Sequence, residues 1–221
     1  RDWSSDVCSS DLLRNMLLSN GTLVASDAEM RIEFRIDYGG TPVLLPHARL
    51  TAILNSVPRG GEVTLTVEGA KCSVRAGNGL WTLPTESVSE YPAWKAKGLK
   101  PVARLPADQF SRCVGGVSFA VDSSTSRFAL GGVMLDVADG ELHFVATDGR
   151  RLACVLAELD QAVDDSTTLV PVSMMTTLQR LAEKSEGAVQ IEANANEVVA
   201  TMDHATVTAR LIEGKFPEIG R

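Results

Sequence analysis

Three short stretches of the chain carry apolar residues at helical spacing, and each follows a proline. The prolines are Pro46, Pro106 and Pro171. The apolar positions after them are Leu50, Ile53, Leu54 and Val57, then Phe110, Cys113, Val114 and Val117, then Met174, Leu178, Leu181 and Ala182. Because steps of three and four residues return to one side of a helix, each stretch predicts a surface helix with one buried face. Proline suits the first turn of a helix, so we expect each helix to begin at its proline.

Between these stretches, apolar and polar residues alternate as they do in half-buried β-strands. Val63, Leu65 and Val67 alternate with threonines, and Val189 and Ile191 alternate with polar residues. Turn sequences separate the strands, namely Arg59-Gly60-Gly61, Gly77-Asn78-Gly79, Asp139-Gly140 and Asp148-Gly149. Many strands with few helices, each helix covering one face of a sheet, predict an α+β fold.

One domain-sized pattern occurs twice along the chain. Residues 21–37 (GTLVASDAEMRIEFRID) and 140–160 (GELHFVATDGRRLACVLAELD) both predict two strands joined by a turn that contains aspartate. A strand ending in proline, a helix, further strands and an aromatic-proline pair follow each. Pro46 and Pro171 are 125 residues apart, as are Pro92 and Pro217. This offset far exceeds solenoid periods of roughly 20–50 residues, so we predict a duplicated domain.

The two copies suggest boundaries for the domains. We expect residues 13–93 to form the C-terminal part of a first domain, 94–101 (WKAKGLKP) to be a connector, and 102–221 to form a second domain. The first copy has one predicted helix where the second has two, so we interpret it as incomplete. Residues 1–12 (RDWSSDVCSSDL) lack both periodicities and resemble a translated sequencing adaptor. We therefore interpret them as a non-native leader, and the chain as a fragment truncated at both ends.

Composition excludes several classes of protein. With 221 residues, of which 44% are hydrophobic, the chain can bury one or two cores. No run approaches the roughly 18 apolar residues that span a membrane, so we expect a soluble, cytoplasmic protein. The four cysteines contain no C-x-x-C pair, and the three histidines have no metal-ligand spacing. Nucleophile-elbow and phosphate-binding glycine motifs are also absent, so we expect no catalytic residue, metal or cofactor.

The net charge of −7 argues against a tight grip on nucleic acid. Duplex DNA carries about one negative charge per 1.7 Å of axis, and proteins that bind it tightly present many clustered cations. A role on DNA would therefore need a few local cations or a shape that encloses the duplex.

The run Val145-Ala146-Thr147-Asp148-Gly149-Arg150-Arg151-Leu152-Ala153, with Phe216-Pro217-Glu218 downstream, resembles the β subunit of bacterial DNA polymerase III, the sliding-clamp family. The resemblance covers residues 13–221. It implies the DNA-clamp fold, in which antiparallel-sheet domains with two helices on one face are repeated three times per subunit. Two subunits close head to tail into a ring, with sheets outside and helices lining the hole. A third domain is absent here, so this chain alone is not expected to close a ring.

The resemblance also implies partners and sites. The implied partners are double-stranded DNA, which is encircled without sequence specificity, the polymerase III catalytic subunit, the clamp loader, and other polymerases and repair proteins. The resemblance also implies a homodimer at full length. Residues that match the family's partner-peptide pocket are Arg127, Leu130, Thr147, Gly149, Arg150, Arg151, Leu152, Pro217 and Arg221. Arg150 stands where relatives often have histidine or an aromatic residue. Cations on or near the predicted helices that would face DNA are Arg49, Arg59, Arg112, Arg180 and Lys184.

Simpler interpretations of the same residues remain open. The 147–152 segment can be an ordinary turn between two strands, with Asp148 as its turn-former and Leu152 in the core. The helix cations can be ordinary solvated side chains. A small α+β hydrolase or transferase with an unrecognised site, or a non-clamp scaffold of duplicated domains, would also fit the composition.

Overall fold

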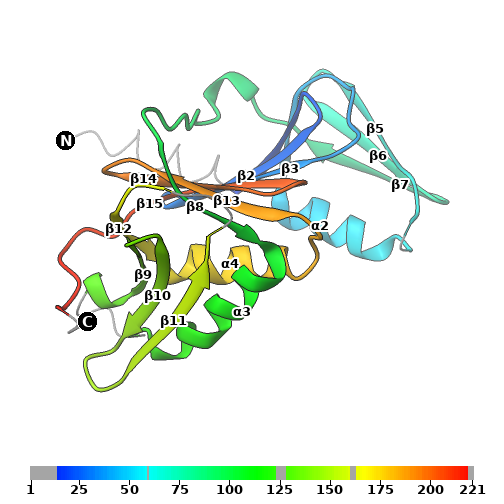
Figure 1. The fold of residues 1–221 in the computed structure, drawn as a ribbon. Coiled ribbons are helices and arrows are strands. Elements are labelled where there is room, and N and C mark those ends of the chain that lie inside the picture. The colour runs from blue at the N-terminus through cyan, green and yellow to red at the C-terminus, as the bar shows by residue number, and fades with distance from the viewer. Residues whose placement is uncertain (1–13, 59, 123–127, 160–162, 219–221) are drawn as a thin grey trace, which may run out of the picture. The chain divides into compact units, whose positions relative to one another are not determined.

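The computed structural model describes residues 14–58, 60–122, 128–159 and 163–218 (Figure 1). The chain divides into two compact units, Arg1–Trp94 and Lys95–Arg221. The interpreted leader, residues 1–12, lies outside the described residues. The first strand of the second unit begins at Lys100, inside the segment expected to be a connector. The domain boundaries drawn from the sequence stay predictions.

The first unit contains two antiparallel sheets and one α-helix. Its elements are β1 (Asn15–Ser19), β2 (Thr22–Ser26), β3 (Met30–Arg35), β4 (Val43–Pro46), α2 (His47–Ser56), β5 (Val63–Glu68), β6 (Lys71–Ala76), β7 (Gly79–Pro84) and the 3-10 turn η1 (Val88–Glu90). Within this unit the strands pair in the orders β4-β1-β2-β3 and β5-β6-β7.

The second unit repeats this plan and adds a strand and a helix. Its elements are β8 (Lys100–Pro106), α3 (Ala107–Val117), η2 (Ser118–Ala120), η3 (Phe128–Leu130), β9 (Gly132–Ala138), β10 (Glu141–Thr147), β11 (Leu152–Glu158), β12 (Ser166–Pro171), α4 (Val172–Ala182), β13 (Ala188–Ala193), β14 (Glu197–Thr201) and β15 (Ala205–Arg210). The strands pair antiparallel in the orders β11-β10-β9-β12 and β15-β14-β13-β8. Helices α3 and α4 pack side by side and contact strands of both sheets (Figure 1).

The predicted duplication is confirmed down to individual hydrogen bonds. Three strands, a strand ending in proline, a helix and three more strands follow one another in the same order in both units. The turn between the second and third strands of each set also matches. Asp27 Oδ1 accepts hydrogen bonds from the N–H groups of Glu29 and Met30, and Asp148 Oδ1 accepts them from Arg150 and Arg151.

All three predicted helices form, but each begins one residue after its proline. Pro46, Pro106 and Pro171 are the last residues of β4, β8 and β12, and each has an extended ψ between 116° and 143°. The expectation that these prolines occupy the first helical turn is therefore wrong by one position. The fixed φ of proline suits a strand end as well as a helix start, so sequence alone does not separate the two.

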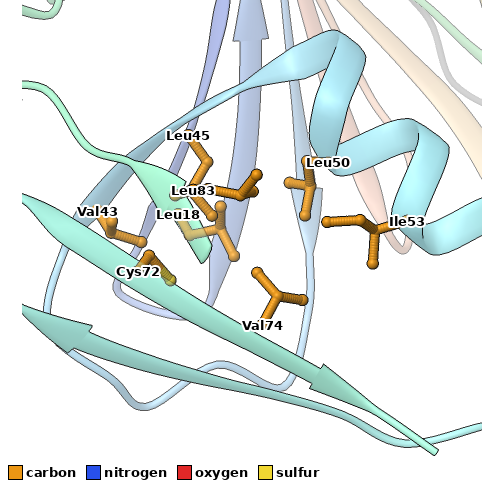
Figure 2. Close-up of a cluster of buried hydrophobic side chains, with 8 residues drawn as sticks. All are labelled: Leu18, Val43, Leu45, Leu50, Ile53, Cys72, Val74 and Leu83. Carbon is orange, nitrogen blue, oxygen red and sulfur yellow. The ribbon is translucent and has the colours of Figure 1, made fainter. Parts of the chain in front are cut away.

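The core of the first unit lies between helix α2 and its two sheets. Leu50 and Ile53 of α2 point toward strand residues of that unit, including Val74 (Figure 2). Leu54, which belongs to the predicted apolar stripe, is 41% exposed instead. The described part of this unit contains no second helix that could cover it.

The core of the second unit is centred on α3, α4 and the sheet faces that they contact. The predicted stripe of α3 is buried in full, and Phe110 meets Phe144 of β10 edge to face, with ring centroids 5.9 Å apart. On α4, Met174, Leu178 and Ala182 are buried, as predicted. This core fixes the ends of β10 and β11, where the candidate site lies.

Candidate functional site

The 147–152 segment is a rigid turn between β10 and β11. Thr147 is buried, donates its hydroxyl hydrogen to the carbonyl oxygen of Arg151 at 2.6 Å, and accepts a hydrogen bond from the N–H of Gly149 at 3.1 Å. Asp148 Oδ1 accepts hydrogen bonds from the N–H groups of Arg150 and Arg151 at 2.9 and 3.0 Å. Gly149 has φ +82°, a conformation that glycine adopts without strain. Asp148 therefore forms the turn, as expected.

Asp148 also holds the side chain of Arg151. Its Oδ2 lies 2.9 Å from Arg151 Nε. The hydrogen bonds from the N–H groups of Arg150 and Arg151 lower the pKa of the Asp148 carboxyl below its usual value, and the Arg151 side chain lowers it further. Asp148 is therefore ionised at neutral pH, and it fixes an exposed cation beside the turn.

Leu152 is the first residue of β11 and pairs directly with Thr147. Its side chain is 54% exposed, so the interpretation that placed Leu152 in the core is wrong. Side chains alternate between the two faces of a strand, and the face of β11 that carries Leu152 also carries Leu156, which is 52% exposed. An exposed leucine beside a fixed turn can contact an apolar side chain of a partner.

The segment after β15 lies against the same face of this sheet, beside strands β9, β10 and β12. Phe216 is buried and packs with Met134, Val145 and Leu169. An added Cβ on Gly214 would approach the Cβ of Ala129 to 3.2 Å, so this segment also runs along η3. Pro217, which is exposed, directly follows Phe216, and Leu130, which is buried, directly follows Ala129. These contacts therefore bring Pro217 and Leu130 close to each other.

Phe216 was missing from the residues assigned to the site from sequence. Its signal was the duplicated aromatic-proline pair, because Tyr91 before Pro92 is buried in the first unit just as Phe216 is buried before Pro217. Gly149 and Arg150 are exposed on the turn. Arg127 and Arg221, which also belong to the assigned pocket, lie outside the described residues.

The helices carry the expected exposed cations. Arg49, Arg112 and Arg180 are exposed on α2, α3 and α4, whereas Lys184 is exposed two residues beyond the end of α4. Arg59 lies outside the described residues. Arg112 donates to Asp108 at 2.6 Å, one helical turn earlier, and this pair lowers the pKa of the Asp108 carboxyl. Within helices α2, α3 and α4, Asp108 is the one acidic residue, and there are three arginines.

Features of other protein classes are not found in the described ranges. Among those residues, no group of three or more His, Cys, Asp or Glu side chains is placed to hold a metal ion. In the same part of the chain, none of the helices has both the length and the apolar character needed to cross a membrane.

The comparison with protein families identifies the family of the chain. Residues 104–218 match the model of the DNA polymerase III beta subunit, central domain. The chain belongs to this family. Its expected α+β clamp fold is confirmed, and the family is that of a non-catalytic subunit, as expected.

Relatives in the family match almost the whole chain. The beta sliding clamp of Salmonella typhimurium is 26% identical over 220 residues, which cover 95% of this chain and 60% of that protein. The beta sliding clamp of Pseudomonas aeruginosa is 29% identical over 205 residues, covering 90% of this chain and 56% of that protein. The chain thus spans about 60% of the length of such relatives.

Solved clamp structures have a similar fold over most of this chain. The P. aeruginosa polymerase III subunit beta superposes with a TM-score of 0.84 at 28% identity, covering 94% of this chain and 59% of that one. A P. aeruginosa clamp bound to griselimycin gives 0.86 at 27% identity, with the same coverage of both chains. The Caulobacter crescentus clamp gives 0.82 at 26% identity and covers 94% of this chain and 60% of that one.

Proposed function

We propose that the chain is part of a sliding clamp, a processivity factor that encloses duplex DNA and tethers the replicative polymerase. The observation that carries this proposal is the duplicated unit, which matches solved clamps over 94% of the chain with TM-scores of 0.82 to 0.86. A clamp uses repeated units of this kind to build an arc. The rest of the ring would come from a third domain and from a second subunit, and the complete ring would work in the cytoplasm without a metal or cofactor.

The distribution of charge supports retention of DNA by enclosure. A protein that surrounds the duplex needs no strong phosphate contacts, so a net charge of −7 is compatible with the role. Helices α2, α3 and α4 differ from this negative overall charge, because together they contain three arginines and one aspartate. We assign Arg49, Arg112 and Arg180, with Arg59 and Lys184, to the surface that faces DNA. There they would supply a mild positive potential that permits sliding.

The exposed leucine beside the fixed turn supports capture of a peptide. Leu152 supplies an apolar contact, Thr147 and Gly149 fix the turn, and Arg150 and Arg151 supply a cationic rim. We assign these residues, with Leu130, Pro217, Arg127 and Arg221, to a pocket for short peptides. Its partners would be the polymerase III catalytic subunit, the clamp loader, and other polymerases and repair proteins.

A processivity assay tests the proposed function. The protein, in the longest form that its gene encodes, is loaded onto primed circular single-stranded DNA with a clamp loader and a polymerase III core. We expect longer products per polymerase binding event than without it. Unchanged product length after successful loading would reject the proposal.

The DNA-facing assignment is tested by charge reversal on a helix. Arg49→Glu should weaken the association of the protein with duplex DNA and reduce the dependence of log K on log salt by about 1. Arg75→Glu, which reverses an exposed arginine on strand β6, is the matched control and should change neither quantity. Equal effects of the two substitutions would show that the helix surface has no special role.

The peptide pocket is tested by two substitutions on one strand. Leu152→Asp should abolish binding of partner peptides, whereas Leu156→Asp should leave it intact. Both side chains are about half exposed on the same face of β11, so each change should alter stability by no more than about 0.5 kcal/mol. Peptide binding measured by fluorescence anisotropy that survives Leu152→Asp would remove the pocket from this position.

A further inference from the structure

The segment that links the two units, residues 92–99, is held near both of its ends by side chains. At its start, Arg31 of β3 donates a hydrogen bond from Nη1 to the carbonyl oxygen of Pro92 at 3.2 Å. Further along, Asn194 donates from Nδ2 to the carbonyl oxygen of Lys97 at 2.9 Å. Each bond lies within one compact unit, so the linking segment is fixed to each unit separately.

The side chain of Arg31 is itself fixed. It is only 12% exposed, and its Nε lies 2.6 Å from Glu33 Oε1 on the same strand. Tyr91, directly before Pro92, is buried in a hydrophobic cluster of the first unit. The guanidinium therefore reaches the Pro92 carbonyl from a defined position, at the point where the chain leaves this core.

Asn194 is fixed by the turn between β13 and β14. Its Oδ1 accepts hydrogen bonds from the N–H groups of Asn196 and Glu197, both at 2.8 Å. Because the oxygen is engaged by the turn, the amide nitrogen is the group that can serve another partner. One side chain thus holds the turn with its oxygen and the linking segment with its nitrogen.

The duplication shows that a unit folds without either contact. The second unit has Leu152 at the place of Arg31, at the same register position after the turn. The first unit has Glu68 at the place of Asn194, before the matching two-residue turn. Neither a leucine nor an ionised carboxylate can donate to a carbonyl oxygen. Both contacts are therefore additions to the shared plan, and both act on the one segment that joins the two copies.

The two contacts shorten the part of the chain that can extend between the units. A fully extended chain gains at most about 3.3–3.6 Å per residue. From buried Tyr91 to Lys100, the first residue of β8, the chain advances nine residues and can extend to about 30–32 Å. From Pro92 to Lys97 it advances five residues and can extend to only about 17–18 Å.

We infer that the linking segment is a restrained connection and not a flexible linker, and that the hydrogen bonds from Arg31 and Asn194 limit its extension. While both bonds persist, only the chain between Pro92 and Lys97 can lengthen. Loss of either bond releases the residues on that side. The inference goes beyond the proposed function, because it requires neither DNA nor a peptide.

Limited digestion with trypsin tests this inference, because Lys95 and Lys97 are both exposed on the linking segment. A serine protease must place the carbonyl oxygen of the bond that it cuts in its own oxyanion hole, and Asn194 holds the Lys97 carbonyl oxygen. No described residue donates a hydrogen bond to the Lys95 carbonyl oxygen. At low protease concentration, cleavage follows the population of the open form.

The measured quantity is the rate of cleavage after each lysine in the full chain, divided by the rate in a free peptide of residues 90–102. We expect cleavage after Lys95 to be about fivefold faster than after Lys97, which corresponds to about 1 kcal/mol, the net worth of one hydrogen bond. Asn194→Asp keeps Oδ1 for the turn but cannot donate, so this ratio should fall to about one. Arg31→Met keeps a long apolar stem without donors and frees the start of the segment, so both rates should rise about threefold at an unchanged ratio.

Controls separate release of the linking segment from general unfolding. Cleavage after Lys71 in β6 reports opening of the first unit and should not change in either variant. Asn78→Asp and Arg75→Met, at exposed positions of the first unit, are the matched controls and should leave the linking-segment rates unaltered. A native ratio of one, or a ratio that stays at five in Asn194→Asp, would show that Asn194 does not restrain the segment. Unchanged rates in Arg31→Met, or a rise that cleavage after Lys71 follows equally, would reject the role of Arg31.

Discussion

Replacing Phe110 with alanine should destabilise the second unit more than any surface change. Phe110 is fully buried on α3 and meets Phe144 of β10 edge to face at 5.9 Å. Truncation of a buried phenylalanine costs about 3–5 kcal/mol, of which the aromatic pair supplies about 0.5–1.5 kcal/mol. This is a large part of the roughly 5–15 kcal/mol that stabilises a typical domain. At about 4 °C per kcal/mol, the melting temperature of this unit should fall by about 12–20 °C.

Calorimetry combined with thiol trapping measures this loss. Cys113 is buried on the same helix, so its alkylation in increasing urea reports the opening of the second unit. Phe110→Leu fills most of the space and should cost only about 1–1.5 kcal/mol. A loss below about 1 kcal/mol for Phe110→Ala would refute the account of the core, because it would show that α3 is not anchored through this contact.

Two further predictions concern backbone packing and thiols. An alanine Cβ at Gly132 would lie 2.5 Å from the Val170 carbonyl oxygen, so Gly132→Ala should lower the free energy of unfolding by about 1–3 kcal/mol in urea titrations. Gly39→Ala is the control. Its Cβ would meet no atom within 4 Å, so it should change the free energy of unfolding by less than about 0.5 kcal/mol. In the native protein, iodoacetamide should label exposed Cys154 before buried Cys72, and peptide mapping would show the order of labelling. The reaction at Cys154 should still be slow at neutral pH, because partial burial raises the pKa of its thiol. Labelling of Cys72 first would contradict the burial described.

The sequence pattern predicted burial well where a neighbouring element covers the apolar face of a helix. The stripe from Phe110 to Val117 is buried because α3 contacts sheet strands and α4. Leu54 is exposed although its spacing is equally helical. At the equivalent place on α4, Gln179 reaches the Ser111 carbonyl of α3, and the described part of the first unit has no such neighbour. Periodicity shows that a helix has an apolar face, but it does not show which partner covers that face.

The candidate site was predictable only in part, for a related reason. The turn chemistry of Asp148 is local and follows from the sequence. The contact between Arg151 and Phe119 joins residues from different elements, and no local pattern reports it. The exposure of Leu152 depends on which face of β11 the helices cover, and alternation alone leaves both faces possible.

The direct passage from strand to helix at Pro46, Pro106 and Pro171 has a mechanical consequence. No residue separates the last paired strand position from the first helical one, so each junction is a rigid connection between strand and helix. A force applied to the sheet would therefore be transmitted directly to the helix. Bending of such a unit would have to occur elsewhere in the chain.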